Sequence, residues 1–209
     1  LDNKACLVFK TQTLVSDAAI WIKQRDIAKL DNIPEELTPL TPLYDPEPKS
    51  FYLDKKVEYK IRVSGDMDVS NTGIFTQDPN GSLAFLSNGV KSRGKIMYGR
   101  LLELKPFALM RDTKPPSIKN VSLNDLDTLT VQKEFVVTFQ TTDSGSGIDD
   151  DRLIETILDG KKILNEYDPE KDIVKTFKTD LSKGGHEFVI KVADNVGNAV
   201  QKKLRLFAK

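Results

Sequence analysis

The chain has 209 residues, of which 39% are hydrophobic and 30% charged, so it can bury the core of one large or two small soluble domains. Its 31 Lys and Arg residues balance its 31 Asp and Glu residues, and this total gives no reason to expect nucleic acid or an anionic membrane as a partner. No apolar run approaches the roughly 18 residues of a membrane-spanning helix. A single cysteine excludes an internal disulfide.

The first half of the chain is expected to be rich in β-strands. Apolar residues alternate in segments 5–10, 18–24 and 57–64, which is the two-residue period of a strand. A short helix over 18–30 is the alternative to the second strand. Segment 73–87 reads as a hairpin closed by DPNG, and 95–104 and 106–112 as further strands. Residues 33–51 contain five prolines, so we expect a long surface connection there, neither a helix nor a central strand.

A domain boundary is predicted at RDTKPPS, residues 111–117. Pro115 and Pro116 fix φ twice, remove two backbone donors and favour a short stiff joint. We therefore expect one domain over 1–112 and a second over 113–209. The second domain has the size of an immunoglobulin domain.

The second half reads as about seven short strands separated by turns. Segments 117–123, 134–142, 173–180, 186–193 and 199–207 carry strand patterns, and 165–173 reads as a turn. Asp159-Gly160 between apolar runs predicts a tight hairpin, because a type I′ turn needs positive φ at both central residues. The predicted fold is all-β, with two consecutive β-sandwich domains of which the second is immunoglobulin-like.

The segment DNVGN, residues 194–198, lies between two strand-like runs and is predicted to connect them. Gly197 can adopt positive φ at little cost. The carboxylate of Asp194 can accept backbone N–H groups within the turn, and Asn198 tolerates the left-handed region.

Zinc and nucleophile chemistry find little support in the composition. The chain has one histidine, His186, and one cysteine, Cys6, so the sequence supports neither a set of zinc ligands nor a Ser-His-Asp or Cys-His arrangement. We expect His186 to be an edge or turn histidine without a ligand role, and Cys6 to be a small buried residue of its strand. Phosphate-binding glycine motifs are absent from the sequence.

Calcium is the one metal for which the sequence offers donors. The loop DSGSGIDDD supplies oxygen ligands from Asp143, Ser144, Asp149, Asp150 and Asp151, although it lacks the spacing of an EF-hand. The same residue types cap backbone N–H groups in any tight loop. We expect no catalytic, cofactor-binding or metal-binding residue in this chain. Calcium remains an alternative if this loop folds over the same end of the sandwich as Asp194.

Carbohydrate binding and carbohydrate cleavage are two further alternatives. Aromatic residues that could stack on sugars are Trp21, Tyr44, Phe51, Tyr52 and Tyr98, although aromatic side chains are more often part of a core. Glycoside hydrolysis needs two carboxylates across a cleft, and the sequence singles out no such pair.

Several motifs occur in one order: FALMRDTKPPSI, DSGSGIDD, ILDGKKILNEYD, LSKGGH and VADNVGN. The series resembles the immunoglobulin-like module that follows the catalytic domain in secreted bacterial zinc peptidases of the M23 type, which cut peptidoglycan. The matching residues are Phe107, Asp112, Pro115, Pro116, Asp143, Ser146, Gly147, Ile148, Leu158, Asp159, Gly160, Tyr167, Asp168, Leu181, Gly184, His186, Val192, Asp194, Gly197 and Asn198. The likeness covers residues 105–207 and extends to 1–104 only through strand order and PLYDPEP.

The resemblance implies a non-catalytic accessory region of a secreted envelope protein, since none of that family's zinc ligands has a counterpart here. The chain begins at Leu1 without a leader pattern, so a fragment or processed product is expected. Expected partners are a cell-wall or surface polysaccharide or an adjoining peptidase domain, in the periplasm, at the cell surface or outside the cell. The alternatives are an adhesion or carbohydrate-binding module without a peptidase, and a hydrolase working through carboxylates.

Overall fold

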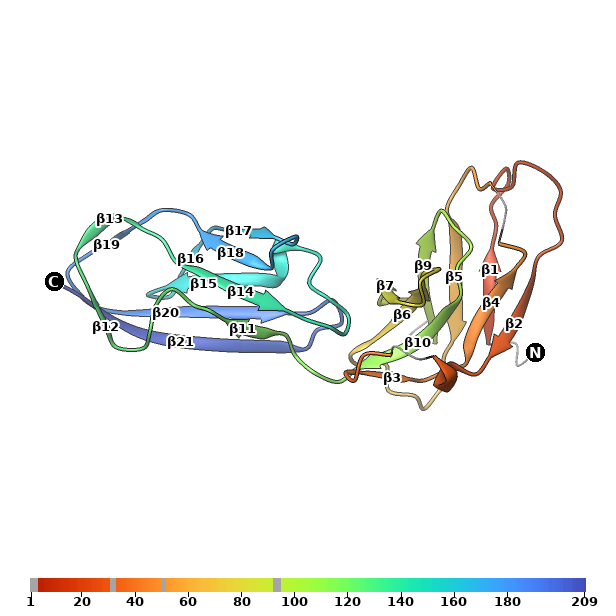
Figure 1. Ribbon diagram of the computed structural model, residues 1–209, viewed down its shortest axis with the longest axis horizontal. Helices are drawn as coiled ribbons and strands as arrows, with labels where there is room; N and C mark the ends of the chain where they lie inside the picture. Colours follow the sequence, from red (N-terminus) through yellow and green to blue (C-terminus); the bar gives the residue numbers. More distant parts are fainter. Residues whose placement is uncertain (1–3, 31–32, 50–51, 92–94) are drawn as a thin grey trace. The chain divides into compact units, whose positions relative to one another are not determined.

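The computed structural model describes residues 4–30, 33–49, 52–91 and 95–209, and it divides into two compact units (Figure 1). The first unit ends at Thr113 and the second begins at Lys114, within the RDTKPPS segment. Each unit is built almost entirely of β-strands. Among the described residues, no helix has the length and apolar character needed to span a membrane.

The first unit consists of two antiparallel sheets. One has the order β1 (Ala5–Val8), β5 (Val57–Arg62), β9 (Ile96–Leu101), β8 (Gly89–Lys91). The other has the order β2 (Trp21–Arg25), β4 (Leu43–Glu47), β10 (Phe107–Asp112), β6 (Thr72–Gln77), β7 (Leu83–Ser87), and β3 (Leu37–Pro39) also pairs with β10. A 3-10 turn η1 (Ile27–Lys29) follows β2, where a helix was the alternative.

Strand β10 is buried on both faces. Phe107 and Leu109 join a core that includes Tyr59, whose ring meets that of Phe107 edge to face at 4.8 Å between centroids. Ala108 and Met110 point the other way, into a second cluster of buried side chains. Burial on both faces explains why the sequence here is apolar without alternation.

The expectation of a surface connection over residues 33–51 is wrong. This segment supplies β3 and β4, and β4 lies inside its sheet between β2 and β10 with Leu43 and Tyr44 fully buried. Strand β10 pairs with β4 only at Tyr44, so beyond that point β4 has one neighbour, β2. A strand without a second neighbour can accommodate Pro46, which lacks an N–H. The hairpin predicted over 73–87 is confirmed as β6 and β7.

The second unit has the strand order of an immunoglobulin-like sandwich. One sheet runs β11 (Ser117–Lys119), β14 (Thr138–Thr142), β18 (Ile173–Thr176), β17 (Asn165–Asp168), as in the ABED sheet of that fold. The other runs β12 (Asp127–Leu129), β21 (Ala199–Ala208), β20 (Gly184–Ala193), β15 (Ile154–Leu158), β16 (Lys161–Ile163), with β21, β20 and β15 in the positions of strands G, F and C. Strands β13 (Gln132–Phe135) and β19 (Thr179–Leu181) form a small third sheet, and η2 (Asp151–Leu153) is a 3-10 turn.

The strand pattern of the second half is confirmed with two corrections. Phe135, Val137 and Phe139 are all buried, as their shared face predicts, but segment 134–142 divides between β13 and β14, which pair with different neighbours. Residues 165–168 form strand β17, not a turn, because the chain reverses only after Asp168 and returns as β18. The predicted reversal at Asp159-Gly160 is confirmed, with φ of 48° and 77°.

Candidate functional site

The segment 194–198 is a turn that Asp194 closes. Its Oδ1 atom accepts the backbone N–H groups of Val196 at 2.9 Å and Asn198 at 2.8 Å, and its Oδ2 atom accepts the Asn198 side-chain amide at 2.6 Å. Gly197 has φ of 95°, as predicted. The side chain of Asp194 therefore holds the connection between β20 and β21 from inside, which accounts for its burial at 1% exposure.

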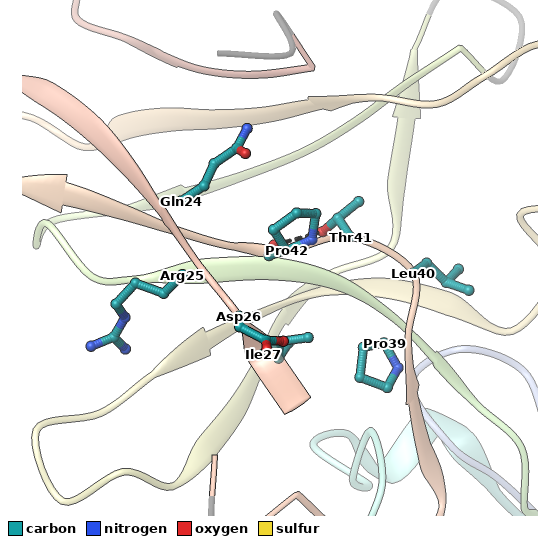
Figure 2. Close-up of a pocket in the computed structure, with 8 residues that line it drawn as sticks. All are labelled: Gln24, Arg25, Asp26, Ile27, Pro39, Leu40, Thr41 and Pro42. Atoms are coloured by element: carbon teal, nitrogen blue, oxygen red, sulfur yellow. Dashed lines mark hydrogen bonds between the residues drawn. The ribbon is translucent and has the colours of Figure 1, made fainter. Parts of the chain in front are cut away.

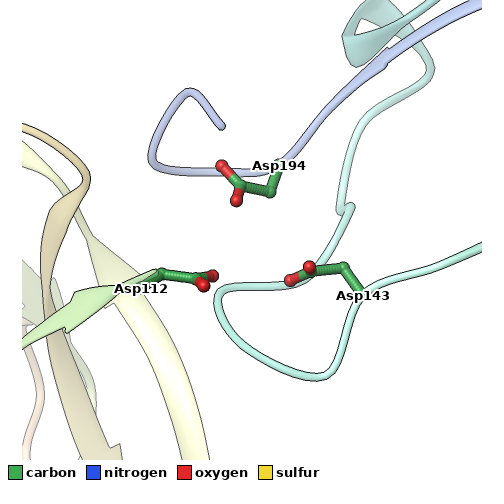
Figure 3. A group of neighbouring side chains, drawn as sticks. All are labelled: Asp112, Asp143 and Asp194. Atoms are coloured by element: carbon green, nitrogen blue, oxygen red, sulfur yellow. The ribbon is translucent and has the colours of Figure 1, made fainter. Parts of the chain in front are cut away.

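The loop after β14 folds over the same end of the second sandwich. The backbone N–H of Asn195 donates to the Gly147 carbonyl at 3.0 Å, and its side-chain amide donates to the Ser146 carbonyl at 2.9 Å. Carboxylate oxygens of Asp143 and Asp194 lie within 4.8 Å of each other, and Figure 3 shows these two side chains on their loops. The acidic loop and Asp194 therefore lie at the same end of the sandwich, which is the condition under which calcium stays an alternative.

Three acidic residues of the loop have structural roles of their own. Asp150 caps η2 by accepting the Arg152 N–H at 2.8 Å, and it also forms an ion pair with the Arg152 guanidinium. Asp151 belongs to η2 itself. The Asp143 carboxylate accepts the Gly147 N–H at 2.7 Å. Asp143 and Asp150 thus hold the loop's own backbone, in the manner expected of a tight turn.

His186 lies in β20 and has an ion-pair partner that the sequence did not reveal. Its Nδ1 atom is 2.7 Å from Asp159 Oδ2 and its Nε2 atom is 2.8 Å from the Ser182 carbonyl. Both partners are acceptors, so the two hydrogen bonds form together only when both ring nitrogens carry protons, which favours the imidazolium. His186 was expected to be an edge or turn histidine, and it lies in β20 opposite Leu206 of β21. The ion pair was missed because the two residues are 27 positions apart.

The ionisation of the pair follows from these contacts. The hydrogen bond to Asp159 raises the pKa of His186 above its ordinary value, against the opposing effect of burial. Burial works against ionisation of Asp159, but the hydrogen bonds from His186 and from the Glu187 N–H outweigh it and lower the pKa of Asp159. A hollow of about 500 Å³ adjoins the pair, lined also by Lys161 and Lys178.

A second hollow, of about 480 Å³, lies in the first unit between the end of β2 and residues 39–42 (Figure 2). Its polar groups serve the fold. The Thr41 hydroxyl donates to the Pro42 carbonyl and accepts the Leu109 N–H at 3.0 Å. Asp26 caps η1, and Arg25 donates to Gln77 at 2.6 Å.

Cys6 and the aromatic residues that the sequence singled out lie in different parts of the first unit. Cys6 is exposed, so the expectation that it is buried is wrong: in the edge strand β1 its neighbours Ala5 and Leu7 face inward and Cys6 faces outward. Trp21 is 51% exposed and Tyr52 is 89% exposed, whereas Tyr44 is a core residue. The Nζ atom of Lys91 covers the Tyr98 ring at 3.8 Å, and Phe51 lies outside the described residues.

Comparisons with known proteins place few limits on function. No family model matches the chain, and no curated protein matches it. Among solved structures, dimeric latent PorU from Porphyromonas gingivalis aligns with 13% identity and a TM-score of 0.35 over 74% of this chain, which spans 22% of PorU. The fibronectin(III)-like modules of CbhA from Clostridium thermocellum align with 16% identity and a TM-score of 0.37, covering 74% of this chain and 86% of that one. Likenesses this distant say nothing of what the chain binds.

Proposed function

We propose that this chain is a non-catalytic accessory or binding region of a secreted bacterial cell-envelope protein, and that its parent polypeptide is an M23-type peptidoglycan endopeptidase. The observation that carries the non-catalytic role is the use made of the chain's one histidine. Both ring nitrogens of His186 are engaged, by Asp159 and by the Ser182 carbonyl, which holds the ring in place and favours its cationic form. A histidine held in this way is not available as a general base.

The link to a peptidase rests on the motif series of residues 107–198. Several of its members build turns: Asp159 and Gly160 reverse the chain between β15 and β16, and Asp194 and Gly197 do so between β20 and β21. These residues support an accessory sandwich. The family's zinc ligands would have to lie in the parent polypeptide.

Two measurements test this proposal separately. The open reading frame upstream of Leu1 should encode the HxxxD and HxH zinc motifs of the family, and a frame without them refutes the peptidase parentage. The isolated chain should release no soluble fragments from purified peptidoglycan, with or without added Zn²⁺. Hydrolysis by this chain alone would contradict the non-catalytic role whatever the parent is.

A second candidate is an adhesion or carbohydrate-binding module with no linked peptidase. The exposure of Trp21 and Tyr52 in the first unit favours it, because an exposed aromatic ring can stack on a sugar. This binding role can be tested on a glycan array and in a pull-down on peptidoglycan sacculi. Each assay compares wild type with Trp21→Ala. Absence of retention on every polysaccharide counts against this role.

A further inference from the structure

The outward face of the sheet β1-β5-β9-β8 is strongly basic. Along β5, Tyr59 and Ile61 point into the core and are fully buried, so Glu58, Lys60 and Arg62 point outward. Cross-strand pairs share a face, which places Arg100 beside Glu58 in this row.

Glu58 is the one carboxylate among the outward residues of these four strands, all of which the structure describes. Its Oε1 atom lies 3.0 Å from Lys60 Nζ and 3.1 Å from Lys91 Nζ, and its Oε2 atom lies 2.9 Å from Arg100. Three cations thus share one anion, and they cover it to 8% exposure. The surplus positive charge remains on the surface, since Arg100 is itself half exposed.

The basic surface continues into a hollow of about 360 Å³ at one end of the face, lined by Val8, Lys10, Lys55, Lys56, Glu58 and Arg100. The three lysines are exposed. Lys55 donates to the Thr11 carbonyl at 3.0 Å and to Gln12 at 3.3 Å, both of which are neutral groups. Among the residues that the structure describes, no carboxylate forms an ion pair with any of these lysines.

We call the set Lys10, Lys55, Lys56, Lys60, Arg62, Lys91 and Arg100 the basic face. We propose that the basic face binds an anionic polysaccharide, with a charged sugar unit seated in the hollow between Val8 and the three lysines. The inference rests on the binding role proposed above and adds the ligand class and its place. The neutral total charge conceals this face, because equal numbers of acids and bases say nothing of where they lie.

The geometry favours an extended anionic chain. Alternate residues of a strand lie about 6.8 Å apart, so Lys60 and Arg62 present charges in a line that a polymer with regularly spaced anions can follow. The hollow falls at the lower end of the range of ligand pockets, roughly 300 to 1,000 Å³, which suits a single sugar unit. Val8 and the aliphatic stems of the lysines supply an apolar floor against which a sugar ring can pack.

Nucleic acid and membrane are less well matched. Single-stranded nucleic acid is bound by aromatic platforms on which bases stack, and the ring of Tyr98 on this face is covered by Lys91. A membrane surface calls for large apolar side chains beside the cations, and Val8, at 36% exposure, is small.

The test measures binding of the full chain to polygalacturonate, with neutral dextran, double-stranded DNA and anionic lipid vesicles as parallel arms. The triple variant K10Q/K55Q/K56Q should lower affinity for polygalacturonate about tenfold or more, and added salt should weaken binding of the wild type. The matched control K175Q/K191Q/K202Q removes the same charge from exposed lysines of the second unit and should change affinity by less than about twofold. Glu58→Gln should strengthen binding, because it frees cations that now pair with the carboxylate.

Equal losses in the two triple variants, or tighter binding to DNA or vesicles than to polygalacturonate, would overturn the inference. Retention on peptidoglycan sacculi that is insensitive to K10Q/K55Q/K56Q would also overturn it while leaving the proposed binding role in place. Failure to bind sacculi and every polysaccharide would remove both.

Discussion

Replacing His186 with Gln should remove a pH-dependent part of the stability of the second unit. The histidine side chain is 6% exposed and makes two hydrogen bonds, to Asp159 and to the Ser182 carbonyl. A hydrogen bond to a charged group contributes about 1.5–3 kcal/mol. Asp159 is 46% exposed, so water weakens the pair and we expect a loss of roughly 1–2 kcal/mol in H186Q.

The directions of the two pKa shifts determine how the stability contributed by the pair changes with pH. The pKa of His186 is raised in the folded state, so its contribution is fully present below the unfolded value of about 6.5 and is lost as the pH rises through the folded pKa. The pKa of Asp159 is lowered, so its contribution is present above the unfolded value of about 3.9 and is lost as the pH falls through the folded pKa. The pair is therefore strongest between about pH 4 and 6.5.

The stability contributed by His186 can be measured by urea unfolding, followed by far-UV circular dichroism, at intervals between about pH 5.5 and 8. The chain has one histidine, so no second imidazole titrates in this range. Wild type should lose stability relative to H186Q as the pH rises. Asp180→Asn, which alters an exposed carboxylate lining the same hollow, should retain the wild-type pH dependence. Parallel pH profiles for wild type and H186Q would refute the assignment of an imidazolium.

Three further outcomes are expected. Gly197→Ala should lower the free energy of unfolding by about 1 kcal/mol, because φ is 95° at this position. Gly65→Ala is the control: an added Cβ meets nothing within 4 Å at either glycine, but Gly65 lies outside the left-handed region, so its substitution should be neutral. Equal melting temperatures for the two variants would contradict this prediction. The hydrogen bonds from Lys60, Arg100 and Lys91 lower the pKa of Glu58 to about 2 against the effect of burial, so wild type should lose more stability than Glu58→Gln as the pH falls from 5 to about 2 in acid titrations. Millimolar Ca²⁺ should raise the melting temperature no more than Mg²⁺, since Asp194 already accepts three N–H groups, and a shift seen with Ca²⁺ alone would show that a calcium site exists.

The turns were predictable because local chemistry determines them. Asp159-Gly160 and Gly197 adopt positive φ whatever they pack against, and Asp194 satisfies N–H groups only two and four residues away. Alternation of apolar and polar residues identified most strands for the same reason, because the backbone of a strand points successive side chains to opposite faces.

Features that depend on distant partners could not be predicted. A proline is unfavourable in most central strands because it lacks an N–H. Pro46 is accommodated in β4 only because β10 leaves that part of the strand unpaired. Cys6 faces outward because Ala5 and Leu7, on either side of it, face the core, and alternation alone does not say which face of the strand is buried. The partner of His186 and the clustering of lysines around Val8 both require the fold.

The hairpin of β20 and β21 also bears on how the second unit folds. Each strand has ten residues, and the pairing continues without interruption from Ala193 and Ala199 at the turn to Gly184 and Ala208. Contacts between residues close in sequence require little loop closure, so this ribbon can form before the pairing of β12 with β21 or of β11 with β14. The turn at Asp194 should therefore be ordered early in the folding of the second unit, before the strands that pair over long sequence distances.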